Sequence, residues 1–197
     1  MIGLSGIAGS GKDLFCRMLL KEIKGTRIAL ADPLKEEVRG FILQEYGIDI
    51  LNCALKEKNK VRDFLVFYGG IKRYESRGRY WTGKAQKKVD ATNHTPVVTD
   101  VRYSEYKGDE VDWLKKENKG VLVHIRKYCE LETAGTHVKR IYFSPPNKEE
   151  TRNDPRLLEK ADYCIEWPHI ENLNEKKIKD TLYPYVKEFA DWYKERK

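Results

Sequence analysis

The feature that most constrains this chain is a glycine-rich segment near its N-terminus, Gly6-Ile7-Ala8-Gly9-Ser10-Gly11-Lys12-Asp13. It matches the phosphate-binding pattern G-x-x-x-x-G-K, which is normally followed by Ser or Thr. Residues 1–5 before it are typical of a strand, and residues 14–20 after it are typical of a helix with one apolar side. In this context backbone N–H groups, the helix N-terminus and the lysine bind phosphate. The alternative is a glycine turn that merely contains Gly-Lys, and the spacing and both flanks argue against it.

Asp13 is the one departure from the pattern, and its carboxylate bears on metal binding. The usual Ser or Thr lends a hydroxyl to Mg²⁺, and a carboxylate is a hard, charged oxygen ligand that can serve the same ion. Asp13 also stands in the first turn of the expected helix, where negative charge is favoured. Helix capping is therefore the alternative, but we favour Asp13 as a Mg²⁺ ligand.

Composition indicates one globular domain with a polar surface. The chain has 197 residues, of which 40% are hydrophobic and 35% charged. No apolar run approaches the ~20 residues of a membrane span, and the N-terminus lacks the pattern of a signal peptide. The cysteines are scattered, with no C-x-x-C and no histidine at zinc spacing: Cys16, Cys53, Cys129 and Cys164. We therefore expect a cytoplasmic protein with reduced thiols and no membrane partner.

The net charge of +7 permits nucleic-acid binding but equally suits a polyphosphate site. Lysines and arginines are spread along the whole chain, and neither an RNA-binding aromatic pattern nor a helix-turn-helix pattern is present. A small-molecule partner is therefore expected rather than a nucleic acid, and a homodimer is left open.

Strand-like runs alternate with helix-like stretches. The expected strands are residues 2–7, 26–31, 96–101, 121–126 and 163–167, and the clearest helices are residues 33–46, 61–74, 109–117 and 175–197. This alternation predicts an α/β fold, a five-stranded parallel sheet with helices on both faces. Pro184 predicts a kink or two helices in the last stretch. The pattern of residues 136–143 does not decide between an extra strand and a loop.

Asp100 and Arg102 end an apolar, strand-like run. The carboxyl ends of parallel strands face the ligand crevice, and residues two apart project from one face of a strand. An acid at this place can hold Mg²⁺ through water or accept hydrogen bonds from a substrate, and an arginine can clamp a phosphate. A surface ion pair is the alternative.

The second strand is followed by Asp32, Pro33 and Lys35. Asp32 and Pro33 are typical of the start of a helix. Lys35 then lies in the first helical turn, where a cation is disfavoured. A nearby bound phosphate would offset that cost, and simple solvation is the other explanation.

Two further segments are rich in arginine. Residues 69–81 include Arg73, Arg77 and Trp81, which suit a phosphate and a stacked base, although a solvated helix end with a buried tryptophan is as good an explanation. Residues 149–160 carry Arg152 and Arg156, four apart on one helix face. They suit a lid that brings arginines onto a phosphate, or simply a charged surface. The four histidines form no ligand set, and no Ser-His-Asp arrangement is supported.

Four segments together resemble the deoxynucleoside monophosphate kinases of tailed bacteriophages: residues 4–13, 30–35, 69–81 and 98–102. The similarity runs from residue 1 to about residue 126 and resumes at residues 161–165. The resemblance implies a nucleoside monophosphate kinase-like P-loop fold, with one kinase domain over residues 1–197. It also implies a substrate-binding helical region at about residues 33–95 and a lid at about residues 144–160.

The resemblance further implies Mg²⁺-dependent, in-line transfer of the γ-phosphate of ATP to a deoxynucleoside monophosphate, in the host cytoplasm if a phage encodes the chain. By position, ATP would be held by Gly9, Ser10, Gly11, Lys12, Asp13 and Leu14. The substrate would face Lys35, Arg73, Arg77, Trp81, Asp100, Arg102 and Glu105. Lys12, Arg102 and Arg152 would act in catalysis, and Asp13 would bind the metal. Leu14 departs from the family, which often has Thr there, and Glu105 lies one residue before the family's usual Glu.

Three other functions are compatible with the loop. One is a kinase of another small phosphate monoester, such as phosphomevalonate, and another is a basic P-loop ATPase that acts on nucleic acid. The third is a nucleotide-gated switch with negligible turnover, but the chain lacks the guanine-reading Asn-Lys-x-Asp pattern of GTPases.

Overall fold

The computed structural model describes residues 1–132, 138–170 and 174–196. The strands are β1 (Ile2–Ser5), β2 (Gly25–Ile28), β3 (Thr95–Val98), β4 (Val121–Glu132), β5 (Val138–Tyr142) and β6 (Tyr163–Pro168). The helices are α1 (Lys12–Leu19), α2 (Ala31–Tyr46), α3 (Leu55–Lys60), α4 (Arg62–Glu75), α5 (Arg79–Asp90), α6 (Glu110–Asp112), α7 (Lys148–Glu159) and α8 (Glu175–Glu195). Helix α6 continues directly into a π-helical turn, η1 (Trp113–Glu117).

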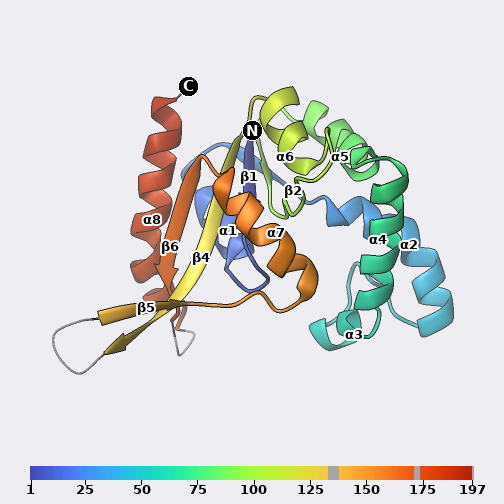
Figure 1. The fold of residues 1–197 in the computed structure, drawn as a ribbon, viewed down its shortest axis with the longest axis horizontal. Coiled ribbons are helices and arrows are strands. Elements are labelled where there is room, and N and C mark those ends of the chain that lie inside the picture. The colour runs from blue at the N-terminus through green and yellow to red at the C-terminus, as the bar shows by residue number, and fades with distance from the viewer. Residues whose placement is uncertain (133–137, 171–173, 197) are drawn as a thin grey trace.

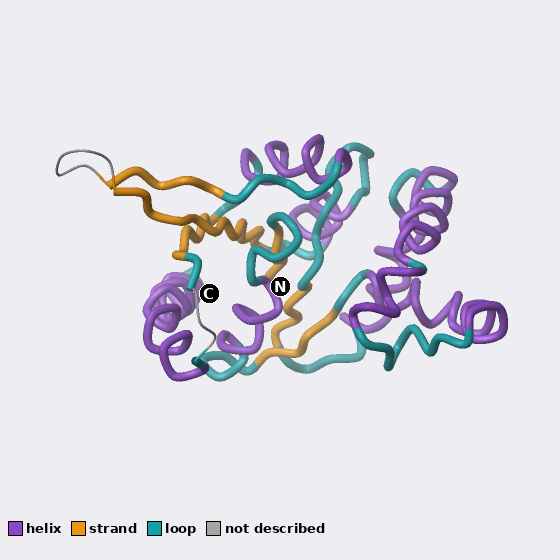
Figure 2. The backbone as a smooth tube through the Cα atoms, turned by 90° about the horizontal axis from the view of Figure 1, so that it is seen from below, coloured by secondary structure: helices purple, strands orange, loops and turns teal. Residues whose placement is uncertain are grey.

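The strands of the described residues form one sheet (Figure 1). Five strands are mutually parallel in the order β2-β3-β1-β4-β6, and β5 pairs antiparallel with the far end of β4. The predicted parallel α/β sheet is confirmed, and β5 confirms a strand in the described part of residues 136–143. Because β4 is 12 residues long, its end and β5 form an arm that projects from the body (Figure 2).

Helices cover both faces of the sheet, because side chains of the central strand β1 alternate between two cores. Leu4 is buried on one face with Phe15 of α1 and Phe189 of α8. Gly3 points to the opposite face, where a Cβ would lie 2.3 Å from Leu114 Cδ2. Only glycine therefore lets η1 approach β1 so closely. Leu157 of α7 joins the same second core.

Helix α8 runs without interruption past Pro184 (Figure 1). Of the two predicted alternatives, two separate helices are wrong, and a kink at Pro184 stays a prediction. Proline removes one backbone hydrogen bond, but Leu182 and Val186 on either side are buried against the sheet. Tertiary packing of an apolar face supplies most of a helix's stability in proteins, so a single missing bond does not end the helix.

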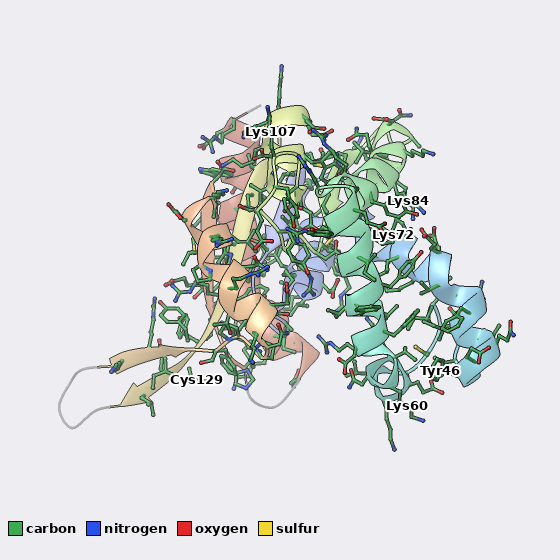
Figure 3. All side chains as sticks on the ribbon, turned by 45° about the vertical axis from the view of Figure 1, so that its right-hand side comes forward. Tyr46, Lys60, Lys72, Lys84, Lys107 and Cys129 are labelled. Atoms are coloured by element: carbon green, nitrogen blue, oxygen red, sulfur yellow. The ribbon has the colours of Figure 1, made fainter. Side chains whose placement is uncertain are left out.

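Helices α2–α5 lie to one side of the sheet, between β2 and β3 in the chain (Figure 1). They have an apolar cluster of their own, which includes Val38, Ile42 and Leu65. The Glu37 carboxylate on α2 accepts hydrogen bonds from Tyr68, Tyr80 and Lys84, and so connects α2 with α4 and α5. Lys84 lies on this side of the molecule in Figure 3.

All four cysteines are free thiols, and Cys129 lies on the arm formed by β4 and β5 (Figure 3). Among the helices that the structure describes, none has both the length and the apolar character needed to cross a bilayer.

Candidate functional site

The glycine loop between β1 and α1 has the backbone conformation that its glycines allow. Gly6, Gly9 and Gly11 have φ values of 125°, 78° and 98°, a region that other residues rarely adopt. A Cβ at Gly11 would also lie 2.3 Å from the Trp167 ring. The Trp167 indole N–H donates to the Ser10 carbonyl (2.8 Å) and so supports the loop from β6.

Lys12 points back into the loop. Its ammonium donates to the carbonyls of Gly6 (2.7 Å) and Ile7 (2.8 Å), and the side chain is buried. Burial, and after it the nearby Arg102, lower the pKa of Lys12 to about 8 against the opposing effect of Glu150. The loop therefore holds a desolvated cation, which is the arrangement needed to bind outer phosphates.

Asp13 and Leu14 begin α1 but differ in their surroundings. Asp13 is largely exposed, with a carboxylate oxygen 3.6 Å from the Arg27 guanidinium, whereas Leu14 packs against the core below the loop. No cluster of three or more His, Cys, Asp or Glu residues suited to a metal occurs in the described part of the chain. Mg²⁺ is commonly held by one or two carboxylates together with phosphate oxygens and waters. Asp13 fits that mode, and its metal role stays a prediction.

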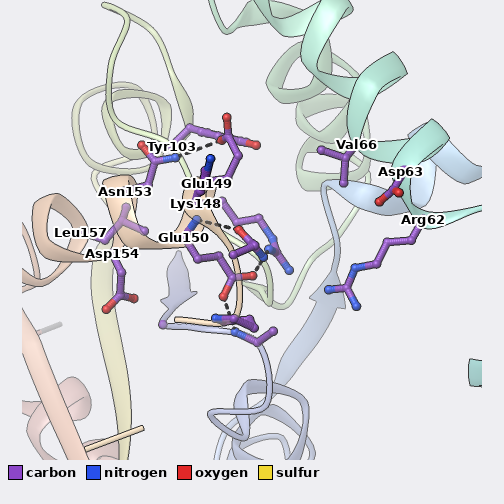
Figure 4. Close-up of a pocket in the computed structure, with 15 residues that line it drawn as sticks. Arg62, Asp63, Val66, Tyr103, Lys148, Glu149, Glu150, Asn153, Asp154 and Leu157 are labelled. Carbon is purple, nitrogen blue, oxygen red and sulfur yellow. Dashed lines mark hydrogen bonds and ion pairs between the residues drawn. The ribbon is translucent and has the colours of Figure 1, made fainter. Parts of the chain in front are cut away.

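A cleft of about 620 Å³ opens beside the loop (Figure 4). Its walls come from segments far apart in the sequence: Gly6 and Ala8 of the loop, Arg62 and Val66 of α4, Arg102 and Tyr103 after β3, and residues 146–157 around α7. Arg102 is the one predicted substrate residue that lines it. Arg62, Tyr103, Glu150 and Asn153 are lining residues that the sequence did not single out.

Arg102 and Glu150 meet at the loop end of this cleft. A guanidinium nitrogen of Arg102 lies 3.0 Å from Glu150 Oε1, and Glu150 Oε2 accepts the Ala8 N–H (2.7 Å). The Arg102 side chain is 44% exposed, whereas Glu150 is only 10% exposed. The arginine is therefore open to a ligand in the cleft.

The carboxylate of Asp100 is engaged by backbone N–H groups at the start of α2. Its two carboxylate oxygens accept the N–H groups of Leu30 (2.7 Å) and Ala31 (2.9 Å). Desolvation raises the pKa of Asp100, and these backbone bonds oppose that effect. Asp100 thus anchors the helix that leads into the α2–α5 region, and the ion pair at this strand end is made by Arg102 with Glu150. The role of Asp100 toward a substrate stays a prediction.

Glu110, at the start of α6, positions the backbone of Arg102. Its carboxylate accepts the N–H groups of Arg102 (2.5 Å) and Tyr103 (3.0 Å). Burial raises the pKa of Glu110 to about 8. In the sequence, only an acidic residue at the start of an expected helix points to this contact.

Besides Asp100 and Glu105, four more of the predicted substrate residues do not line the cleft. Trp81 is 7% exposed and donates its indole N–H to the Gly69 carbonyl (3.0 Å), and Lys35 pairs with Asp32 (3.1 Å). Arg73 is buried between α4 and the loop before α6. Arg77 follows the far end of α4, roughly 20 Å from the cleft end of that helix at 1.5 Å per residue.

Glu105 connects the arginines of α7 with the helical region. One carboxylate oxygen lies 2.8 Å from Arg152 and 3.3 Å from Arg156, and the other lies 2.9 Å from Arg73. Arg152 and Arg156 therefore do share one face of a helix, as their spacing predicted. The predicted lid of residues 144–160 contains α7, and its function as a lid stays a prediction.

The structure brings together a Ser-His-Asp arrangement that the sequence did not support. Ser5 Oγ lies 3.0 Å from His124 Nδ1, and His124 Nε2 lies 3.6 Å from Asp154 Oδ1. Ser5 and His124 are both fully buried, and the Ser5 hydroxyl also donates to the Val123 carbonyl (3.2 Å). A substrate has no access to this hydroxyl, so the arrangement belongs to the packing of α7 on the sheet.

His124 should make stability depend on pH. Burial, and then Arg126 and Lys12, lower its pKa to about 4, whereas an unfolded histidine titrates near 6.5. As the pH falls below 6.5, His124 takes up a proton in the unfolded chain before it does so in the folded protein, which favours unfolding. The contribution of His124 to the free energy of unfolding is therefore complete above pH 6.5 and is lost as the pH falls toward 4. Between pH 7 and 4.5 the wild type should lose about 2 kcal/mol more unfolding free energy than His124→Gln.

Urea denaturation at both pH values measures this difference. His94→Gln, which alters an exposed histidine, serves as the control and should behave like the wild type. Equal pH dependence in the wild type and His124→Gln would show that His124 is not held neutral.

The fold and the loop together define a class of protein. The mostly parallel sheet, with the glycine loop after its central strand β1, is consistent with a Rossmann-like or P-loop-like α/β topology. No protein-family model matches the chain, and no curated protein matches it.

Proposed function

We propose that this chain is a Mg²⁺-dependent kinase that transfers the γ-phosphate of ATP to a deoxynucleoside monophosphate. One observation carries the proposal: Gly6 and Ala8 of the glycine loop and the guanidinium of Arg102 line the same cleft, which also reaches the α2–α5 region. Phosphate-binding groups that lie next to each other at one end of a cleft suit a donor and an acceptor phosphate.

The proposed reaction needs positioning and charge neutralisation more than acid-base chemistry. The loop amides and Lys12 would bind the outer phosphates of ATP. Arg102 would clamp the acceptor phosphate in line with the γ-phosphate, as a guanidinium can bind two oxygens at once. Mg²⁺ held by Asp13 would neutralise charge on the β- and γ-phosphates.

The cleft has room and partners for the rest of a nucleotide. Its volume of about 620 Å³ lies in the range of small-molecule sites. Tyr103, Val66 and Leu157 give the lining apolar surface, and Arg62 adds a cation on the α4 side. In this arrangement the resemblance to phage deoxynucleoside monophosphate kinases supports the choice of acceptor.

The test is ADP release from ATP and Mg²⁺, with each deoxynucleoside and ribonucleoside monophosphate offered separately. We expect release that depends on one or more deoxynucleoside monophosphates, with the matching diphosphate formed. Lys12→Met, which removes the loop cation, should be inactive in the same assay. Acceptor-independent release, or no release from protein shown to bind ATP, would contradict the proposal. Phosphomevalonate and DNA would then be the next compounds to offer.

A further inference from the structure

Glu150 makes a contact that the proposed function does not require. It lies in the first turn of α7, where Asn147 caps the helix by accepting the Glu150 N–H (2.9 Å). Its carboxylate leaves the helix and joins the glycine loop to Arg102, as the dashed lines in Figure 4 show. With 10% of its side chain exposed, it is nearly enclosed at the loop end of the cleft.

The two groups that bind this carboxylate are phosphate-binding groups. Ala8 offers a backbone N–H in the glycine loop, and Arg102 offers a guanidinium. A carboxylate presents two anionic oxygens to such donors much as a phosphate does. A phosphate could not accept the Ala8 N–H while Glu150 stays in place, because Glu150 Oε2 already accepts that hydrogen bond.

The position of Ala8 indicates which phosphate is concerned. The amides at the start of α1 lie at the helix end of the loop, where inner phosphates of a nucleoside triphosphate are cradled. Ala8 lies in the first half of the loop, on the side that lines the cleft with Arg102. The outermost phosphate of a triphosphate is therefore the one that would meet Ala8.

We propose that Glu150 is a specificity-determining residue, whose carboxylate occupies the place of the terminal phosphate, so that a ligand must bring a phosphate there to displace it. The inference rests on the proposed function, since it takes the loop to be a triphosphate site. A diphosphate ends before this place and leaves the carboxylate where it is. Glu150 thus selects ATP over ADP.

The neighbouring acid shows that this contact is particular to Glu150. Glu149 lies in the same turn of α7 and also lines the cleft. Its carboxylate, however, contacts Arg152 (3.9 Å) and Asn153 (3.3 Å), and its side chain is 49% exposed. Glu149→Gln therefore makes the same change of charge and shape one residue away without touching the loop or Arg102.

The test is calorimetric binding of MgATP and of MgADP to the wild type, Glu150→Gln and Glu149→Gln. Glu150→Gln should bind MgATP about tenfold more tightly, since the amide no longer competes as an anion, and MgADP within about twofold of the wild type. Glu149→Gln also removes a negative charge from the cleft lining but touches neither the Ala8 N–H nor Arg102, so any change in affinity should be equal for the two nucleotides. Glu150→Asp keeps the charge, but its shorter side chain no longer extends to the Ala8 N–H, so its binding of both nucleotides should resemble that of Glu150→Gln. It replaces Glu150→Gln in the test if the glutamine variant misfolds.

The outcomes separate this inference from the proposed function. Unchanged or weaker MgATP binding by Glu150→Gln, with binding by the wild type intact, overturns the role of Glu150 alone. An equal gain for MgATP and MgADP overturns the assignment to the terminal phosphate. Failure of all folded forms to bind either nucleotide overturns the proposed function, and this inference with it.

Discussion

Replacing Arg102 by alanine should lower acceptor-dependent turnover by about a hundredfold, the usual effect of removing a group that stabilises charge in the transition state. MgATP affinity should change far less than turnover, because the loop and Lys12 are untouched. The fold should also tolerate the change, since Glu110 binds the backbone N–H of Arg102 rather than its side chain. Steady-state kinetics and calorimetric ATP binding on the same preparation measure both effects.

Two further variants make this prediction specific. Arg102→Lys keeps the charge but not the two-pronged geometry, so it should recover only part of the turnover. Arg39→Ala removes an arginine of α2 that is about as exposed as Arg102 and pairs with Asp49. It lies far from the glycine loop in the chain, so its loss should leave turnover unchanged. Wild-type turnover in Arg102→Ala would eliminate the arginine as the acceptor clamp.

Replacing Asp109 by alanine should lower the free energy of unfolding by about 3–5 kcal/mol, the range found when one partner of a buried ion pair is removed. Asp109 is fully buried and binds Arg73 through two hydrogen bonds of 3.1 and 2.6 Å. It also accepts the N–H groups of Glu105 (3.0 Å) and Tyr106 (3.3 Å). Alanine would leave a buried guanidinium that keeps only Glu105 as an acidic partner.

Urea denaturation at pH 7 tests this expectation. Asp49→Ala breaks the surface pair with Arg39, in which both side chains remain accessible to water, and should cost much less. Asp109→Asn keeps an oxygen for the backbone N–H groups and should fall between the two. A loss in Asp109→Ala no larger than in Asp49→Ala would show that the buried pair contributes little.

The fold was predictable wherever one short segment carries enough information. The loop pattern, its flanking strand and helix, and the parallel strands follow from local spacing and apolar runs. Pro184 shows the limit of that approach. The proline removes one backbone hydrogen bond, which by itself destabilises the helix. Leu182 and Val186 pack on the sheet, however, and the burial of their side chains outweighs that one bond.

The candidate site, too, was predictable only in part from the sequence. Lys12 and Arg102 were singled out because glycine spacing and a strand end constrain where they lie. In the structure Lys12 points into the glycine loop, and Arg102 lines the cleft beside it. Trp81 was equally consistent with stacking and with burial, and it is buried. Such a choice depends on which helices surround the ring, and no local pattern encodes that.

By itself, therefore, the sequence determined an α/β chain with a glycine loop whose lysine lies at the start of a helix. The tertiary structure alone decided that Asp100 anchors α2, that Arg73 is paired with Asp109, and that Glu150 reaches the loop from 142 residues away. The physical reason is that loop conformation and strand character depend on neighbours in the chain. The partner of a charged side chain depends instead on which distant segments the sheet brings together.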